Sequence, residues 1–192
     1  MDMMKRGLQA FSLCLAVAAI ATPALAEGNV NLSLGQRSLD ENDYQPVDEQ
    51  TYFGGTMDFN VDWPVNLAGG LYFSRKADSI GDTDITASVA ELTFGVMKTW
   101  EVASNMHPFV GGGVGIVRAS AEIEDEFFSV EEDDTAPALY TEGGIYWRLN
   151  NAFNLGLSAR FTSAPGIEFS GQEFDTTYFQ IGLLAGWAWG QK

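Results

Sequence analysis

The chain has 192 residues, and its 26 acidic against 10 basic side chains give a formal net charge of −16 at pH 7. This excess of acid argues against nucleic acid as a partner, because phosphates are bound by lysine and arginine. The length fits one domain. The single cysteine, Cys14, lies so early that we expect neither disulfides nor thiol catalysis in the mature protein.

The N-terminus has the pattern of a targeting segment. Lys5 and Arg6 precede an apolar run over residues 11–21, and an Ala-Leu-Ala cleavage motif follows that run. We predict a signal peptide over residues 1–26 that is cleaved off, and one domain over residues 27–192. A retained membrane anchor is the alternative, although the apolar run is short for a span of ~20 residues. Cleavage would leave 8 basic and 25 acidic residues, a formal charge of −17.

Apolar side chains recur at every second position through much of the remaining chain, and a period of two indicates β-strands. We predict eight strands, at residues 30–34, 52–63, 67–74, 90–100, 107–120, 139–149, 153–162 and 177–189. One face of each strand is mostly apolar, and the other is mostly small or polar. In the glycine-rich fifth strand we expect Val110, Val114 and Ile116 to face the apolar side, unless a bulge reverses the alternation.

The predicted connections alternate in length. Long polar segments follow the odd-numbered strands, at residues 37–50, 75–84, 122–135 and 163–173, whereas brief turns follow the even-numbered ones. Transmembrane β-barrels show this asymmetry, with long external loops and short periplasmic turns. No apolar run after residue 26 is long enough for a helical span, and only helices and closed barrels satisfy their backbones in lipid.

We therefore predict an all-β fold, an eight-stranded antiparallel up-and-down transmembrane β-barrel whose last strand pairs with its first. A soluble sandwich or a lipocalin-like barrel is the alternative, because such folds also show alternating strands. The two readings differ in where the apolar face lies. A soluble fold would bury this face and expose charges, whereas a membrane barrel would turn it outward to the lipid.

The five tryptophans all fall where the predicted strands meet the short turns or the end of the chain. Tryptophan is enriched at membrane–water interfaces, so we predict a periplasmic aromatic girdle. Its members are Trp63, Trp100, Trp147, Trp187 and Trp189.

Several charged residues occupy the small and polar faces of the predicted strands, and so would point into the barrel. These are Asp58, Glu91, Glu142, Arg148 and Arg160. The interior of an eight-stranded barrel is just wide enough for side chains to fill, and an unpaired buried charge is costly. We therefore predict a network of carboxylates and guanidinium groups that plugs the lumen. The alternative is a narrow or gated polar pore that opens when these ion pairs rearrange.

Two motifs connect this pattern to a known family. The segment PFVGGGVGIVRA, at residues 108–119, is similar to the strand with an aromatic residue and then glycines that small outer-membrane barrels often carry. The segment QIGLLAGW, at residues 180–187, is similar to their C-terminal assembly signal. The chain thus resembles the eight-stranded barrels typified by the transmembrane domain of OmpA and by OmpX, often called porin-family outer-membrane β-barrel domains.

The resemblance implies a place in the outer membrane of a Gram-negative cell, among membrane lipids and lipopolysaccharide, and a charged lumen like that of OmpA-type barrels. It also implies that the barrel-assembly machinery reads the last strand through Gln180, Gly182, Ala185 and Trp187. One departure concerns the terminus, because family members usually end on an aromatic residue whereas this chain continues with Gly-Gln-Lys after its last tryptophan.

Little else in the sequence points to chemistry. The single histidine, His107, precedes a proline at a predicted turn and has no serine or acid at a suggestive spacing, so we expect neither an enzyme nor a cofactor. The resemblance does not extend to barrel enzymes, which place a histidine at the outer rim. There is no Cys/His metal pattern. The acidic segment 122–134 lacks the glycine and spacing of an EF-hand, which favours a solvated loop over a calcium site.

These observations predict a structural or surface-interaction role, in which the barrel supports the membrane and presents acidic extracellular loops. A small or gated channel for ions or small solutes is one alternative. A surface adhesin or ligand-binding protein that acts through its loops is another, with a ligand that the sequence does not name.

Overall fold

The computed structural model describes the chain over residues 27–39, 47–80, 83–125, 128–150, 152–169, 172–174 and 176–190. The strands in these ranges are β1 (Gly28–Leu39), β2 (Glu49–Phe59), β3 (Asn66–Ile80), β4 (Thr83–Thr99), β5 (Met106–Asp125), β6 (Phe128–Arg148), β7 (Phe153–Ser163), β8 (Ile167–Phe169), β9 (Gln172–Phe174) and β10 (Tyr178–Trp189). Among the described residues, no helix is long and apolar enough to cross a membrane. The predicted signal peptide lies outside these ranges.

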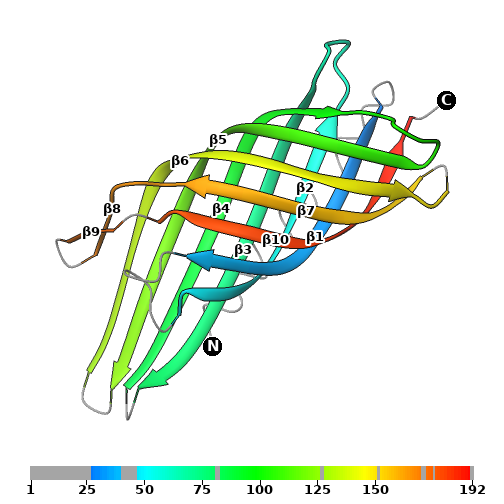
Figure 1. Cartoon of the computed structure of the whole chain (residues 1–192). Helices are drawn as coiled ribbons and strands as arrows, with labels where there is room; N and C mark the ends of the chain where they lie inside the picture. Colours follow the sequence, from blue (N-terminus) through cyan, green and yellow to red (C-terminus); the bar gives the residue numbers. More distant parts are fainter. Residues whose placement is uncertain are drawn as a thin grey trace.

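Eight of the strands form a closed antiparallel barrel in the order β1-β10-β7-β6-β5-β4-β3-β2 (Figure 1). The first and last strands close it, with a register that runs from Gly28 opposite Trp189 to Leu39 opposite Tyr178. This confirms the predicted fold and the predicted pairing of the two terminal strands. The remaining strands, β8 and β9, form a small separate hairpin that lies to the side of the barrel in Figure 1.

The distribution of side chains is the reverse of that in a soluble protein, with large apolar side chains outside and many polar ones inside. Along β10, Leu183 is 61% exposed on the outside, whereas its neighbour Leu184 is 5% exposed in the interior. Val110, Val114 and Ile116 of β5 are exposed too, which confirms the predicted facing of the glycine-rich strand. Apolar residues thus surround the barrel as an outer belt, and this contradicts the soluble alternative, in which the apolar face would be buried.

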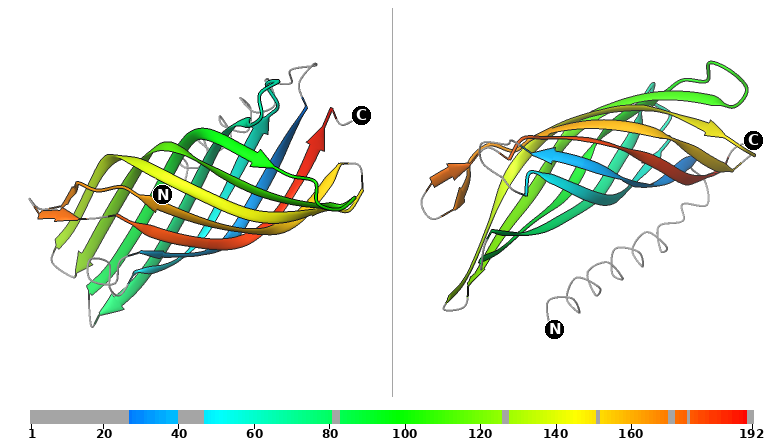
Figure 2. Two further views of the ribbon diagram at one scale, coloured as in Figure 1. Left: turned by 45° about the horizontal axis from the view of Figure 1, so that its top comes forward. Right: turned by 60° about the horizontal axis from the view of Figure 1, so that its bottom comes forward.

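Four neighbouring strands are much longer than predicted. The pairing of β3 with β4 continues to Ile80 opposite Thr83, and that of β5 with β6 continues to Asp125 opposite Phe128. The predictions of loops over residues 75–84 and 122–135 were therefore wrong. Figures 1 and 2 show these strands projecting well past the other four as one sheet. We call residues 76–80, 83–87, 121–125 and 128–132 the extension.

Other boundaries also differ from the prediction. The first strand continues to Leu39 instead of ending at residue 34, so Arg37 belongs to a strand and not to a loop. The second strand ends at Phe59, and the turn that follows contains Asp62 with a positive φ of 59°, which an aspartate tolerates better than most residues. The predicted loop over 163–173 includes β8 and overlaps β9. We call the opposite end of the barrel, with the turns at 60–65 and 100–105 and the connection between β6 and β7, the short-turn end.

Candidate functional site: the barrel lumen

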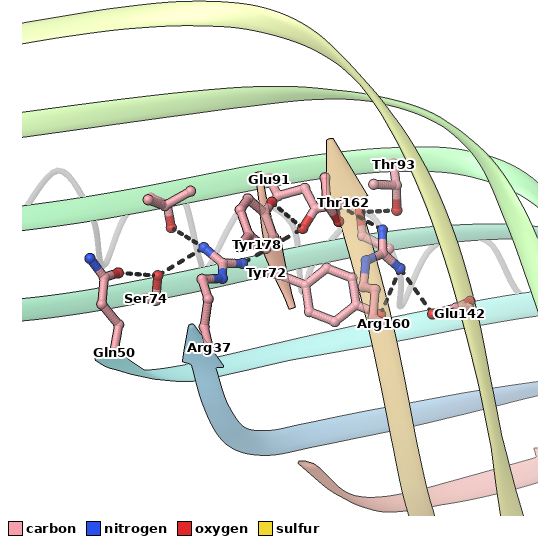
Figure 3. Close-up of polar contacts among 12 residues, drawn as sticks. Arg37, Gln50, Tyr72, Ser74, Glu91, Thr93, Glu142, Arg160, Thr162 and Tyr178 are labelled. Atoms are coloured by element: carbon pink, nitrogen blue, oxygen red, sulfur yellow. Dashed lines mark hydrogen bonds and ion pairs between the residues drawn. The ribbon is translucent and has the colours of Figure 1, made fainter. Parts of the chain in front are cut away.

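The centre of the lumen is occupied by Glu91, an inward residue of β4 whose side chain is fully buried. One carboxylate oxygen accepts a hydrogen bond from Nη2 of Arg160 at 2.7 Å, and the other lies 3.6 Å from Nη2 of Arg37. The hydroxyl of Tyr178 donates to the second oxygen at 2.8 Å, and that of Thr162 donates to the first at 3.3 Å. Figure 3 shows Glu91 between the two guanidinium groups.

Arg160, on β7, connects Glu91 to a second buried carboxylate. Its Nη1 donates to Oε2 of Glu142 at 2.9 Å, so a single guanidinium joins inward residues of β4 and β6. The same group lies over the rings of Tyr140 and Tyr72, at 3.9 and 4.4 Å from their centroids. Aromatic faces attract cations, so the tyrosines stabilise the arginine on the sides where it has no carboxylate.

Arg37 is the residue of this network that the prediction missed. It is completely buried, lies 4.2 Å over the ring of Tyr178, and donates to the hydroxyl of Ser74 at 2.8 Å. Gln180 accepts from its Nε at 3.1 Å and from its Nη2 at 2.9 Å when the amide oxygen faces the arginine. The alternation of β1 gave a signal for it, because Asn31 and the other odd positions of this strand point inward.

A second polar network closes the lumen at the short-turn end. Asp58 accepts hydrogen bonds from Asn66 at 2.7 Å and from Asn29 at 3.2 Å. Arg148 donates to the oxygen of Asn29 at 3.2 Å and to that of Asn154 at 3.2 Å. Asp58 and Arg148 are therefore connected through one asparagine, and the five charged residues predicted as one network are divided between two levels of the barrel.

Apolar side chains separate and cover the two networks. At the end near the extension, the buried cluster consists of Leu39, Val89, Val117, Ala119, Ala136, Ala138, Ala164 and Tyr178. Between the networks lies a second cluster of Ala68, Met97, Phe109, Tyr146 and Leu184. A cavity beside this second cluster, also lined by Glu142, has a volume of about 10 Å³, room for roughly one water molecule. Along its axis the lumen thus alternates between tightly packed polar and apolar layers.

The charges within each network balance. In the central network the two arginines, Arg37 and Arg160, offset the two glutamates, Glu91 and Glu142. In the second network, at the short-turn end, Arg148 offsets the single aspartate, Asp58. Buried charges persist only when they are paired and hydrogen-bonded. The arrangement is therefore chemically suited to fill and hold the barrel together, because the charges of each network balance without an ion from outside, although Oε1 of Glu142 and Nε of Arg160 have no hydrogen-bond partner among the described residues.

The histidine lies in a different setting from the predicted turn. His107 is part of β5, is 8% exposed, and stacks on Tyr146 with ring centroids 5.1 Å apart. It thus packs as an aromatic ring in the lumen near the short-turn end. Within the ranges that the structure describes, no group of histidine, cysteine, aspartate or glutamate side chains could hold a metal ion.

The tryptophans gather at the short-turn end. Trp63 and Trp100 lie in or next to its turns and are 65% and 44% exposed, and Trp147 and Trp187 lie on the outer faces of strand ends. Trp189 is near the closing seam, where it packs edge-on against Phe59 with centroids 5.8 Å apart.

The four residues of the predicted assembly signal lie along β10. Gln180 and Gly182 point into the lumen, whereas Ala185 and Trp187 face outward among the apolar belt. A Cβ at Gly182 would collide with the hydroxyl of Tyr52.

Comparisons with known proteins agree with this architecture. The chain is similar over its whole barrel to the attachment invasion locus protein Ail of Yersinia pestis, which was solved in complex with the heparin analogue sucrose octasulfate. The identity is 13%, the similarity covers 86% of this chain and 99% of that one, and the TM-score is 0.62. It is also similar to Neisserial surface protein A, with 10% identity, coverage of 85% and 95%, and a TM-score of 0.53. At these identities the likeness concerns the fold alone.

The N-terminal β-barrel domain of OprF from Pseudomonas aeruginosa is a third similar structure, with 10% identity, coverage of 85% of this chain and 99% of that one, and a TM-score of 0.50. No curated protein sequence matches the chain. The family model described as "Outer membrane protein beta-barrel domain" matches residues 12–185. The chain therefore belongs to the outer membrane β-barrel protein family, whose place is the outer membrane of Gram-negative cells.

Proposed function

We propose that the chain is a plugged outer-membrane barrel that supports the membrane and presents the extension at the cell surface. It is exported with residues 1–26 as a cleaved signal peptide and is inserted by the barrel-assembly machinery, which reads β10. The short-turn end faces the periplasm, so the five tryptophans form the inner girdle and the extension lies outside. Lipids and lipopolysaccharide surround the apolar belt. Neither catalysis nor a cofactor is part of this role.

The observation that supports a plugged lumen is the charge-balanced network around Glu91. Its carboxylate has contacts with four side chains from β1, β7 and β10, so a path for ions through the centre would have to break several of them at once. Removing one partner of a buried ion pair costs about 3–5 kcal/mol. A channel would need this rearrangement to be frequent, whereas the packing favours a single closed state.

Conductance in planar lipid bilayers tests this proposal against the channel alternative. We expect the purified wild-type barrel to show no stable conductance. Stable wild-type conductance that Arg148→Ala or Arg160→Ala alters would disprove the plug and favour the channel. Lys98→Ala is the matched control, because it removes a cation that lies outside the lumen, at the short-turn end of β4.

The extension favours a surface interaction as a second part of the role. Its strands place acidic residues opposite one another, with Glu122 paired to Glu131 and Asp84 paired to Glu124. Like charges opposite each other destabilise a sheet, so their presence there suggests a use other than stability. Ail was solved with a sulfated polyanion, but an acidic extension suits a cationic partner instead.

Immobilised polymers of opposite charge test this second part. We expect the detergent-solubilised barrel to bind poly-lysine resin and not to bind heparin resin. Deletion of residues 122–134 should abolish most of the poly-lysine binding. Heat-modifiable gel mobility controls for folding of the shortened barrel. If the shortened barrel bound poly-lysine as well as the full chain, the extension would not be the interaction surface.

A further inference from the structure

The cavity between the two networks has a charged wall, which Glu142 forms. The side chain of Glu142 is 5% exposed, and its Oε2 accepts a hydrogen bond from Nη1 of Arg160 at 2.9 Å. Its other oxygen, Oε1, is buried and has no hydrogen-bond partner within the part of the chain that the structure describes. Because the arginine holds Oε2, Oε1 is the atom of this carboxylate that remains available to a ligand in the cavity.

The setting of Oε1 calls for a donor. Nearly all buried polar atoms of folded proteins have a hydrogen-bond partner, and a buried acceptor without one costs free energy. Around the cavity, polar groups of Asn31, Thr56 and Ser158 lie beside apolar side chains such as Met97 and Leu184. A cavity holds water when it is polar and roomy enough to give the molecule two to four partners. The polar side of this cavity meets the first condition.

The size and the charge of the site define its ligand. The cavity volume of about 10 Å³ is room for roughly one water molecule. The central network is already neutral, with two arginines against two glutamates. A cation in the cavity would add a buried charge without a counterion, which is costly. The site therefore suits a small neutral molecule that donates hydrogen bonds.

We propose that this cavity is a binding site for one water molecule, which donates to Oε1 of Glu142 and forms a second hydrogen bond with Asn31. Oδ1 of Asn31 accepts from Nδ2 of Asn154 at 3.4 Å, and Oδ1 of Asn154 accepts from Nε of Arg148 at 3.2 Å. The water thus joins the two networks into one, which reaches from Glu91 to Arg148 across the apolar layer. The site depends on the packing of the lumen and not on the role of the extension.

A crystal structure of the wild-type barrel, at a resolution that shows ordered water, tests the site. We expect one density peak within hydrogen-bonding distance of both Oε1 of Glu142 and the amide group of Asn31. Asn31→Val replaces the second partner with an apolar side chain of comparable size, so we expect the peak to be lost. Asn66→Val is the matched control and should retain the peak, because Asn66 binds Asp58 in the same network but is not among the residues that line the cavity.

Nuclear magnetic resonance in detergent micelles gives a second measurement, which requires no crystals. The methyl groups of Met97 and Leu184 belong to side chains that line the cavity, so the bound water should give nuclear Overhauser contacts to them. The methyl groups of Leu183 are the internal control, because this neighbour is 61% exposed on the outer face. Asn31→Val should remove the contacts at the cavity. Heat-modifiable gel mobility verifies that each variant is folded.

Three results would overturn the site. The first is a wild-type map that shows other ordered waters but no peak at Oε1, together with no water contact at Met97 or Leu184. The second is an anomalous signal at this position in crystals grown with rubidium, which would make it a cation site. The third is an unchanged peak in Asn31→Val or an equal loss in Asn66→Val, because either would mean that the water does not join the two networks. None of these results concerns conductance or binding at the extension, so failure of the site is distinguishable from failure of the proposed function.

Discussion

At the scale of single residues, Glu91 is the side chain on which the stability of the lumen depends most. Its carboxylate is fully buried and contacts two arginines and two hydroxyl groups. A buried charge without partners costs far more than an exposed pair contributes. The stability of the lumen therefore depends on each charge keeping its partners, and the loss of one charge leaves an excess of the other sign.

Substitution of this carboxylate should be strongly destabilising. We expect Glu91→Gln to lower the free energy of unfolding by about 3–5 kcal/mol, because it leaves two buried arginines against one glutamate, an excess of one positive charge. Urea titration of the refolded barrel in lipid vesicles measures the change. Glu49→Gln, at an exposed position of β2, is the control and should stay within about 0.5 kcal/mol of the wild type.

A charge-balanced double variant separates the effect of charge from that of packing. Combined with Arg37→Met, Glu91→Gln should cost less than the sum of the two single changes, because the lumen is neutral again. Strict additivity of the two would show that the residues do not act as one network.

At the scale of elements, the seam between β1 and β10 decides whether the barrel closes. All twelve residues of β1 are in register with β10. Glycines permit a close approach of the two strands, since a Cβ at Gly35 would collide with the backbone of Ile181 and Gly182. A backbone neighbour cannot move aside as a flexible side chain can.

Gly35→Ala should therefore weaken the seam by about 1–3 kcal/mol, the usual cost of overpacking. The temperature at which the fast-migrating folded band disappears on an unheated gel measures this effect. Gly69→Ala is the matched control, because the nearest atom to a Cβ there is the carbonyl oxygen of Thr93 at an ordinary 3.5 Å. Equal losses in the two variants would mean that the seam is not especially sensitive.

The acidic pairs of the extension should destabilise the β5–β6 hairpin, and a charge reversal tests this. Glu131→Lys turns the like-charge pair with Glu122 into an opposite-charge one and should stabilise the β5–β6 hairpin by roughly 0.2–1 kcal/mol. Slower hydrogen exchange of the backbone amides in residues 121–125 and 128–132 would report this gain. Glu49→Lys makes the same charge change opposite Ser38 and should leave those amides unaffected. Unchanged exchange in both variants would contradict repulsion within the hairpin.

At the scale of the whole molecule, the two ends differ in the length of their connections, in their tryptophans and in their charge. One end has short turns and exposed tryptophans, and the other has the extension, which is rich in acidic residues. Transmembrane β-barrels have short turns on the periplasmic side and longer connections on the extracellular side. The asymmetry thus supports one orientation, with the tryptophans on the periplasmic side.

Labelling of intact cells tests this orientation. The predicted mature chain has no cysteine, so Ser79→Cys near the tip of the β3–β4 hairpin and Ser104→Cys in a short turn each introduce a single thiol at an exposed position. A membrane-impermeant maleimide should label the first in intact cells and the second only after the outer membrane is disrupted. The reverse pattern would mean that the short turns face outward.

The sequence alone determined that the chain closes into an eight-stranded barrel with its apolar side outward, because the alternation of apolar and polar residues shows directly which side chains face the lipid. It also determined which side of each strand Glu142 and Arg160 occupy. Only the tertiary structure decided the length of β3–β6, since the many acidic residues of the extension are typical of a loop and the strands there depend on pairing with neighbours. Pairing likewise decided which charges meet: Arg37 joins Glu91 across the lumen, whereas Asp58 and Arg148 belong to another level, and these contacts depend on the register of eight strands around the barrel.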